Sequence, residues 1–179
     1  MFFKFTLSRL LFAGLLALAL PAVAAETRDA MTHFFEANTG DLREELTDAK
    51  AAGKKGLLFM YEQEGCPACL YMKQNVLNRV DVQTLYRKHF AIFTIDLFGS
   101  VPLKDFQGRA LTEKGFAAEA KVRGTPTFAF HDLSGKEVTR VVGAVSDVNE
   151  FKRLAEFVAS GAYKDGAFTV NSAGKATPR

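Results

Sequence analysis

Two cysteines in the segment Gly65-Cys66-Pro67-Ala68-Cys69 limit the fold and the chemistry of this chain more than any other feature. They are its only cysteines, and they follow an apolar run, Gly56 to Tyr61, that suits a buried strand bounded by glycine. On a helix, side chains at positions i and i+3 lie about 5 to 6 Å apart, which a disulfide can bridge. The pattern predicts a strand that leads into a helix whose first turn carries a cysteine pair able to form a disulfide.

The two thiols are expected to have different roles. Cys66 is expected at the helix start, where free backbone N–H groups and the helix dipole favour a thiolate, the nucleophilic form of cysteine. Pro67 fits the first helical turn because its missing N–H is no loss there. We therefore assign Cys66 as the attacking thiol and Cys69, one turn inward, as the resolving thiol. The same pattern is half of a zinc site, but a closed zinc site takes four Cys or His ligands and the chain has no other cysteine.

Residues 1–25 have the pattern of a secretory signal peptide: a basic start, an apolar stretch and a small-residue site for cleavage after Ala24 or Ala25. An uncleaved membrane anchor is the alternative, but the stretch is shorter than the ~20 residues that span a bilayer. Export sends a protein to a compartment where disulfides persist, and we expect the periplasm. Cleavage removes Lys4 and Arg9, so 21 basic residues remain against 20 acidic ones and the net charge falls from +3 to +1. This balance indicates no nucleic-acid partner.

The remaining chain has the length of one domain with its own core. We divide it into an N-terminal arm (26–40), a folded domain (41–163) and a flexible C-terminal tail (164–179). The domain alternates helices and strands and then ends in a hairpin and a helix, which predicts a mixed sheet between helices. The expected elements are a helix from Asp41, a strand over 57–61, a helix through the cysteines to Tyr86 with a break near Asn78, a strand over 90–96, a surface loop or substrate-facing insertion over 97–111, a helix capped by Thr112, strands over 127–131 and 137–142, and a helix from Ser146 or Asp147.

A second motif, Gly124-Thr125-Pro126-Thr127, lies about 60 residues after the cysteines and leads into the hairpin. A strand, a Cys-x-x-Cys helix and a later Thr-Pro entering a hairpin together resemble the thioredoxin superfamily. The segments 62–69 and 122–128 are similar to the exported thioredoxins associated with sulfur oxidation, the SoxW-like group. The resemblance implies an α/β thioredoxin fold: a central mixed β-sheet flanked by helices, here with an insertion before the third main helix.

The resemblance also implies an activity, thiol–disulfide exchange without a cofactor. In it Cys66 attacks a partner disulfide, Cys69 resolves the mixed disulfide, and a cis bond before Pro126 shapes the groove. The backbone of Thr125 would bind an extended partner segment, so the partners are proteins that carry disulfides or thiols. In a SoxW-like role the protein would be a monomeric periplasmic reductant that takes electrons from a membrane thiol transporter.

The sequence departs from thioredoxin at two positions beside the cysteines. Gly65 stands where the family has an aromatic residue, and Met60 stands where it has a buried aspartate. Glu62 and Glu64 are candidates to replace that aspartate as the acid/base group, since Glu62 shares strand parity with Met60. The alternative is that both glutamates are solvated.

A soft-metal module is the alternative function. Thiolates suit Cu(I), which such a module would bind or deliver, but only Met72 lies near the pair as a further soft ligand. The three histidines, His33, His89 and His131, are scattered, so we assign no metal site. An isomerase usually adds a dimerisation domain, for which this chain has no room.

Overall fold

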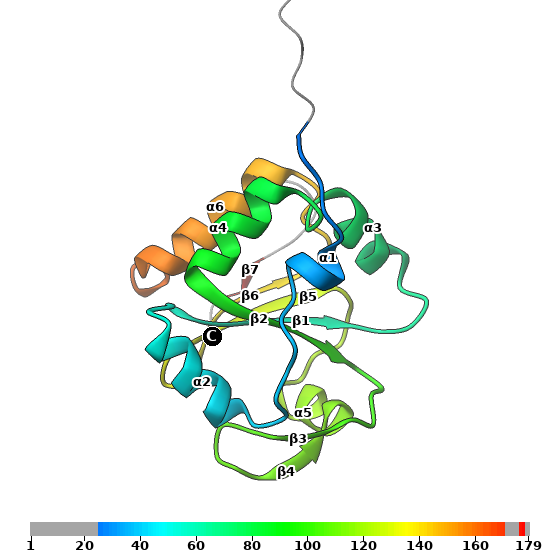
Figure 1. The fold of residues 1–179 in the computed structure, drawn as a ribbon, viewed down its shortest axis with the longest axis vertical. Helices are drawn as coiled ribbons and strands as arrows, with labels where there is room; N and C mark the ends of the chain where they lie inside the picture. The colour runs from blue at the N-terminus through cyan, green and yellow to red at the C-terminus, as the bar shows by residue number, and fades with distance from the viewer. Residues whose placement is uncertain (1–24, 171–175, 178–179) are drawn as a thin grey trace, which may run out of the picture.

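The centre of the fold is a five-stranded mixed sheet, seen in a computed structural model that describes residues 25–170 and 176–177 (Figure 1). Its strands are β1 (Gly56–Glu62), β2 (Phe90–Asp96), β5 (Thr127–Asp132), β6 (Glu137–Val142) and β7 (Ala176–Thr177). Their order is β2-β1-β5-β6-β7, with β1 and β2 parallel and each other neighbouring pair antiparallel. The expected central mixed sheet is confirmed, and the signal peptide lies outside the described residues except for Ala25.

Alternate residues of β1 supply the two halves of the core, because side chains of a strand point in turn to opposite faces. Leu58 and Met60 pack on one face with helices α1 (Ala30–His33), α3 (Pro67–Asn75), α4 (Val80–His89) and α6 (Val148–Ser160). Phe59 and Tyr61 pack on the other with α2 (Leu42–Ala51) and α5 (Glu113–Glu119). Gly56 begins the strand where a Cβ would lie 2.0 Å from the carbonyl oxygen of His131, so only glycine permits this strand contact.

Helix boundaries follow the capping signals of the sequence. The side chains of Asp41, Thr112 and Asp147 accept hydrogen bonds from backbone N–H groups in the first turns of α2, α5 and α6. The break expected near Asn78 separates α3 from α4. No helix among the described residues is both long enough and apolar enough to cross a membrane.

The segment 97–111 is more ordered than the surface loop that we favoured. It contains two short antiparallel strands, β3 (Pro102–Lys104) and β4 (Ala110–Thr112), so the expectation of a loop is wrong and that of an insertion before α5 is right. Buried Asp105 holds the turn between them by accepting hydrogen bonds from the backbone N–H groups of Gln107 and Arg109. Phe106 packs against the rings of Phe59, Phe116 and His131, whereas Phe98 is 68% exposed.

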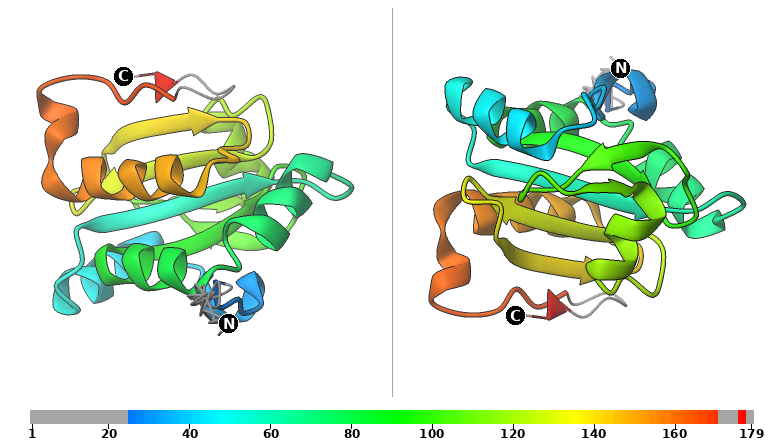
Figure 2. Two further views of the ribbon diagram at one scale, coloured as in Figure 1. Left: turned by 90° about the horizontal axis from the view of Figure 1, so that it is seen from above. Right: turned by 90° about the horizontal axis from the view of Figure 1, so that it is seen from below.

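Both ends of the chain pack more closely than the sequence indicated. In the N-terminal arm, α1 is followed by Phe34 and Phe35, whose side chains are buried in the core. In the segment expected to be a flexible tail, Phe168 and Val170 are buried in the same cluster, after the short 3-10 helix η1 (Ala162–Lys164). β7 then pairs with β6, and Figure 2 shows it at the edge of the sheet.

Candidate active site

The cysteine pair lies where β1 gives way to α3. Cys66 is the N-cap of α3, and its Sγ accepts a hydrogen bond from the backbone N–H of Cys69 at 3.1 Å. The two residues form a disulfide, with their Cα atoms 5.3 Å apart. Cys66 is half-buried and Cys69 is only 3% exposed, so the outer sulfur is the one that a partner reaches first.

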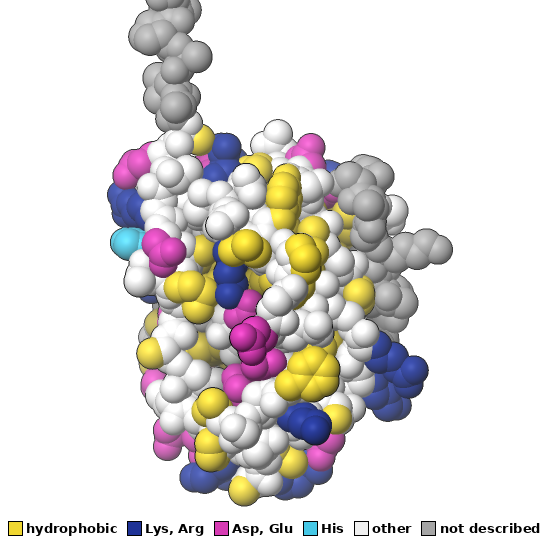
Figure 3. Space-filling view, turned by 90° about the vertical axis from the view of Figure 1, so that its right-hand side faces the viewer, with side chains coloured by type: hydrophobic (Ala, Val, Ile, Leu, Met, Phe, Trp, Pro, Cys, Tyr) yellow, Lys and Arg dark blue, Asp and Glu magenta, His cyan; other side chains and the backbone are white. Residues whose placement is uncertain are grey.

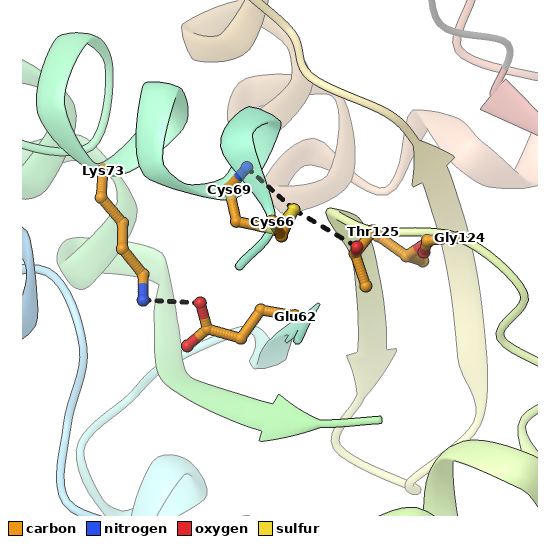
Figure 4. The surroundings of a disulfide bond; sticks show 7 residues. Glu62, Cys66, Cys69, Lys73, Gly124 and Thr125 are labelled. Atoms are coloured by element: carbon orange, nitrogen blue, oxygen red, sulfur yellow. Dashed lines mark hydrogen bonds and ion pairs between the residues drawn. A yellow bond between two sulfur atoms is a disulfide. The ribbon is translucent and has the colours of Figure 1, made fainter. Parts of the chain in front are cut away.

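The Thr-Pro motif lies directly against the outer sulfur. The Thr125–Pro126 peptide bond is cis, as the resemblance implies. The Thr125 hydroxyl donates a hydrogen bond to Cys66 Sγ at 3.3 Å, and Pro126 is buried at the start of β5 (Figure 4). No backbone hydrogen bond within the described residues uses the amide or the carbonyl of Thr125. An extended partner segment could therefore pair with this backbone beside the disulfide.

A groove of about 550 Å³ opens along the disulfide. Its walls come from the end of β1, the turn to α3, the first two turns of α3 and the end of β2. Both cysteines line it, together with Pro67, Leu70 and Asp96. Figure 3 shows the face that carries this groove, with acidic side chains near its centre, Lys or Arg side chains above and below them, and hydrophobic side chains on either side.

Glu62 and Glu64 occupy different places in this groove. Glu62 is the last residue of β1, and its carboxylate forms an ion pair with Lys73 of α3 at 2.5 Å (Figure 4). These side chains are only 19% and 21% exposed, whereas Glu64 is exposed and has no ion-pair partner among the described residues. The structure therefore separates a partly buried, charge-paired glutamate from a solvated one.

Lys73 is a site residue that sequence reasoning missed. Its side chain is only 21% exposed and reaches over the groove to Glu62. The signal was its position four residues after Cys69, since residues four apart share a helix face.

Two further carboxylates extend the acidic wall. The parallel register of β1 and β2 places Asp96 beside Glu62, and a Glu113 carboxylate oxygen accepts a hydrogen bond from the backbone N–H of Asp96 at 3.4 Å. Burial raises the pKa of Glu113 above its ordinary value, and the charges of Asp96 and Glu62 raise it further. No sequence pattern indicated this contact, because it depends on strand register and on the position of α5.

The structure gives physical reasons for the departures from thioredoxin. Met60 is fully buried and lies opposite Phe128 in the β1–β5 pairing, where an unpaired charge would be costly. Gly65 has a φ of +71°, a left-handed conformation that disfavours an aromatic side chain. Among the described residues, no group of three or more His, Cys, Asp or Glu side chains is arranged to hold a metal ion.

The chain matches a known protein family over most of its length. A family model described as "Thioredoxin-like domain" matches residues 42–159, which is more than half of the chain. The chain belongs to this thioredoxin-like family. None of the curated proteins compared with this thioredoxin-like protein matches it.

One solved structure supports the fold, and two others are similar to this chain at a lower score. A thioredoxin-fold protein from Helicobacter pylori superposes with a TM-score of 0.55 at 22% identity, covering 63% of this chain and 74% of the other. A Thermus thermophilus thioredoxin matches at 28% identity and a TM-score of 0.49, over 64% and 81% of the two chains. A DsbH oxidoreductase matches at 20% identity and a TM-score of 0.49, over 79% and 92%. The family and the disulfide together suggest a thiol–disulfide oxidoreductase.

Proposed function

We propose that this thioredoxin-like protein is exported to the periplasm and reduces disulfides of partner proteins there. The observation that carries the proposal is the Cys66–Cys69 bond at the start of α3, with its outer sulfur facing a groove and its inner sulfur buried. The signal-peptide pattern of residues 1–25 supports export, and a membrane thiol transporter would return the protein to its dithiol form. It acts as a monomer.

The reaction follows from the two positions of the sulfurs. In the dithiol form, the Cys66 thiolate attacks one sulfur of the partner disulfide, whose other sulfur leaves as a thiolate and takes up a proton. The Cys69 thiol then loses its proton and attacks Cys66 Sγ, which breaks the mixed disulfide and releases the second partner thiolate. Two electrons pass to the partner, and the protein ends with the bond that the structure contains.

Glu62 is the group that accepts the proton from Cys69. Its carboxylate lies in the same groove as the inner cysteine, is four-fifths buried and is held by Lys73. Glu64 is exposed beside bulk water and is not needed for this step. Glu62→Gln is expected to slow resolution of the mixed disulfide about 100-fold, the lower end of the range of acid–base contributions, while Glu64→Gln leaves it unchanged. Equal rates for both variants would remove Glu62 from the mechanism.

The decisive experiment combines insulin reduction with an equilibrium against glutathione. Cys66→Ser is expected to abolish reduction, and Cys69→Ser to accumulate a mixed disulfide visible by mass spectrometry. A reductant should have a reduction potential of about −270 mV. A reduction potential of about −120 mV would show that the protein oxidises its partners, and would overturn the proposed direction of electron flow. Inactivity towards disulfides together with tight Cu(I) binding would replace the proposal with a soft-metal role. The intact mass of the exported protein tests removal of the signal peptide.

A further inference from the structure

The walls of the groove carry an unbalanced negative charge. Lys73 offsets Glu62, but Glu64, Asp96 and Glu113 have no ion-pair partner in the part of the chain that the structure describes. Glu64 and Asp96 line the groove, and Glu113 lies directly behind Asp96. The lining of the groove is therefore acidic, although the whole chain is slightly basic.

The acidic wall is held in place by the backbone. Gly99 packs so closely on it that a Cβ would lie 2.1 Å from Glu113 Oε2 and 3.0 Å from Asp96 Cβ. The same loop is tied to α5, since Glu113 N–H donates to the Val101 carbonyl at 3.1 Å and Lys114 N–H donates to the Gly99 carbonyl at 3.0 Å. The carboxylates cannot easily move apart, which agrees with the raised pKa of Glu113. A cation placed between them would relieve their repulsion.

Apolar side chains stand on both sides of the acidic wall. Leu70 lines the groove and is 54% exposed, and its neighbour Tyr71 is exposed as well. Phe98 and Val101 are exposed on the loop that follows Asp96, and the Phe98 N–H donates to the Asp96 carboxylate at 2.9 Å. Figure 3 shows this sequence of hydrophobic, acidic and hydrophobic side chains across one face.

Two features that do not depend on charge indicate that the occupant is a peptide. The disulfide opens into the groove, so the occupant must bring a sulfur to Cys66. Thr125, whose hydroxyl contacts the same sulfur, has an amide and a carbonyl that make no backbone hydrogen bond within the described residues and can pair with an extended backbone. A segment bound in this way crosses Cys66, and its residues next to the cysteine lie over the acidic wall.

We propose that the groove selects partner proteins in which a lysine or arginine lies next to the reactive cysteine, in an extended segment that also carries apolar side chains. This rests on the proposed function, because the selection acts on the disulfide exchange at Cys66. Charge complementarity of this kind raises the rate of encounter and fixes the register of binding, and it weakens with salt.

The test uses three disulfide-linked peptides that differ only in the residues flanking the cysteine, which are Lys, Gln or Glu. Their reduction by the dithiol protein is followed by stopped flow, and each rate is divided by the rate with a neutral dithiol, because a flanking charge changes the intrinsic reactivity of the peptide. At low salt the Lys peptide should react roughly 3- to 10-fold faster than the Glu peptide, and the ratio should shrink at about 0.5 M salt.

A pair of double variants locates the effect. Asp96→Asn with Glu113→Gln removes two of the three uncompensated charges but keeps oxygen acceptors for the hydrogen bonds at this site, and it should remove most of the preference for Lys. Glu44→Gln with Asp48→Asn removes two exposed charges on α2, outside the groove, and should leave the preference unchanged. The inference is overturned if the three peptides react at equal normalised rates, or if both double variants lose the preference. If no peptide is reduced at all, the proposed function itself fails.

Discussion

His131 provides a quantitative test of the packing behind the active-site sheet. Its ring is buried on β5 between the rings of Phe59 and Phe106, both 5.2 Å away, and its Nδ1 has no hydrogen-bond partner among the residues that the structure describes. Burial lowers the pKa of His131 from 6.5 to about 4; Glu137 and Asp132 favour the charged form, and Arg140 opposes it. The imidazole is therefore held neutral in the folded protein.

The sign of the effect follows from proton binding in the two states. Between pH 4 and 6.5 the unfolded chain binds a proton at His131 that the folded chain does not, so stability rises with pH. The contribution of neutral His131 to the free energy of unfolding is fully present above pH 6.5 and is lost as the pH falls towards 4. The difference in pKa corresponds to about 3 kcal/mol in total, most of which is lost by pH 4.5.

Urea unfolding of the disulfide-bonded protein at pH 7 and pH 4.5 measures this quantity. The change from pH 7 to pH 4.5 is expected to destabilise His131→Leu less than the wild type, by about 2 to 3 kcal/mol, whatever the stability of the variant at pH 7. His33→Asn at an exposed position serves as the control and should retain the full wild-type difference. An identical acid shift in the wild type and in His131→Leu would refute the assignment of a buried neutral imidazole.

Three further predictions concern the site and its support. Thr125→Val removes the hydroxyl that donates to Cys66 Sγ, so reduction of insulin at pH 7 should slow a few-fold; an unchanged rate would show that this bond does not stabilise the thiolate. Lys73→Met leaves the charge of Glu62 uncompensated in the groove, which destabilises the Cys66 thiolate and should lower the reduction potential measured against glutathione. The added substitution Glu62→Gln should restore the wild-type reduction potential. Tyr86→Phe removes a buried hydrogen bond of 2.7 Å to a main-chain carbonyl of α6 and should lower the free energy of unfolding in urea by about 1 to 3 kcal/mol; a loss near zero would contradict this.

The sequence predicted those elements that local signals specify. The apolar run of β1, the cap at Thr112 and the hairpin of β5 and β6 each carry their own pattern of residues, and the structure confirms them. The cysteine pair was found in the same way, because its spacing is a local property of a helix.

The parts that sequence reasoning missed depend on contacts between distant segments. Phe34 and Phe35 are adjacent and show no helical or strand period, so their burial could not be inferred from spacing. The strands β3 and β4 have three residues each and lie near a proline and glycine, which are typical of loops. Asp96 and Glu113 meet only because β2 lies beside β1 and α5 follows the insertion.

In the proposed mechanism, the acid/base carboxylate lies at the rim of the active site and not in the core. Met60 and Glu62 share one face of β1, since their positions differ by two. At Met60 that face is fully buried in the core, where a carboxylate would have neither water nor a cation beside it. Two residues further on, the same face reaches the groove, and Lys73 pairs with the carboxylate of Glu62. An acid/base group at the rim is exposed to the charges of a bound partner, so the partner's own residues would influence how fast Cys69 resolves the mixed disulfide.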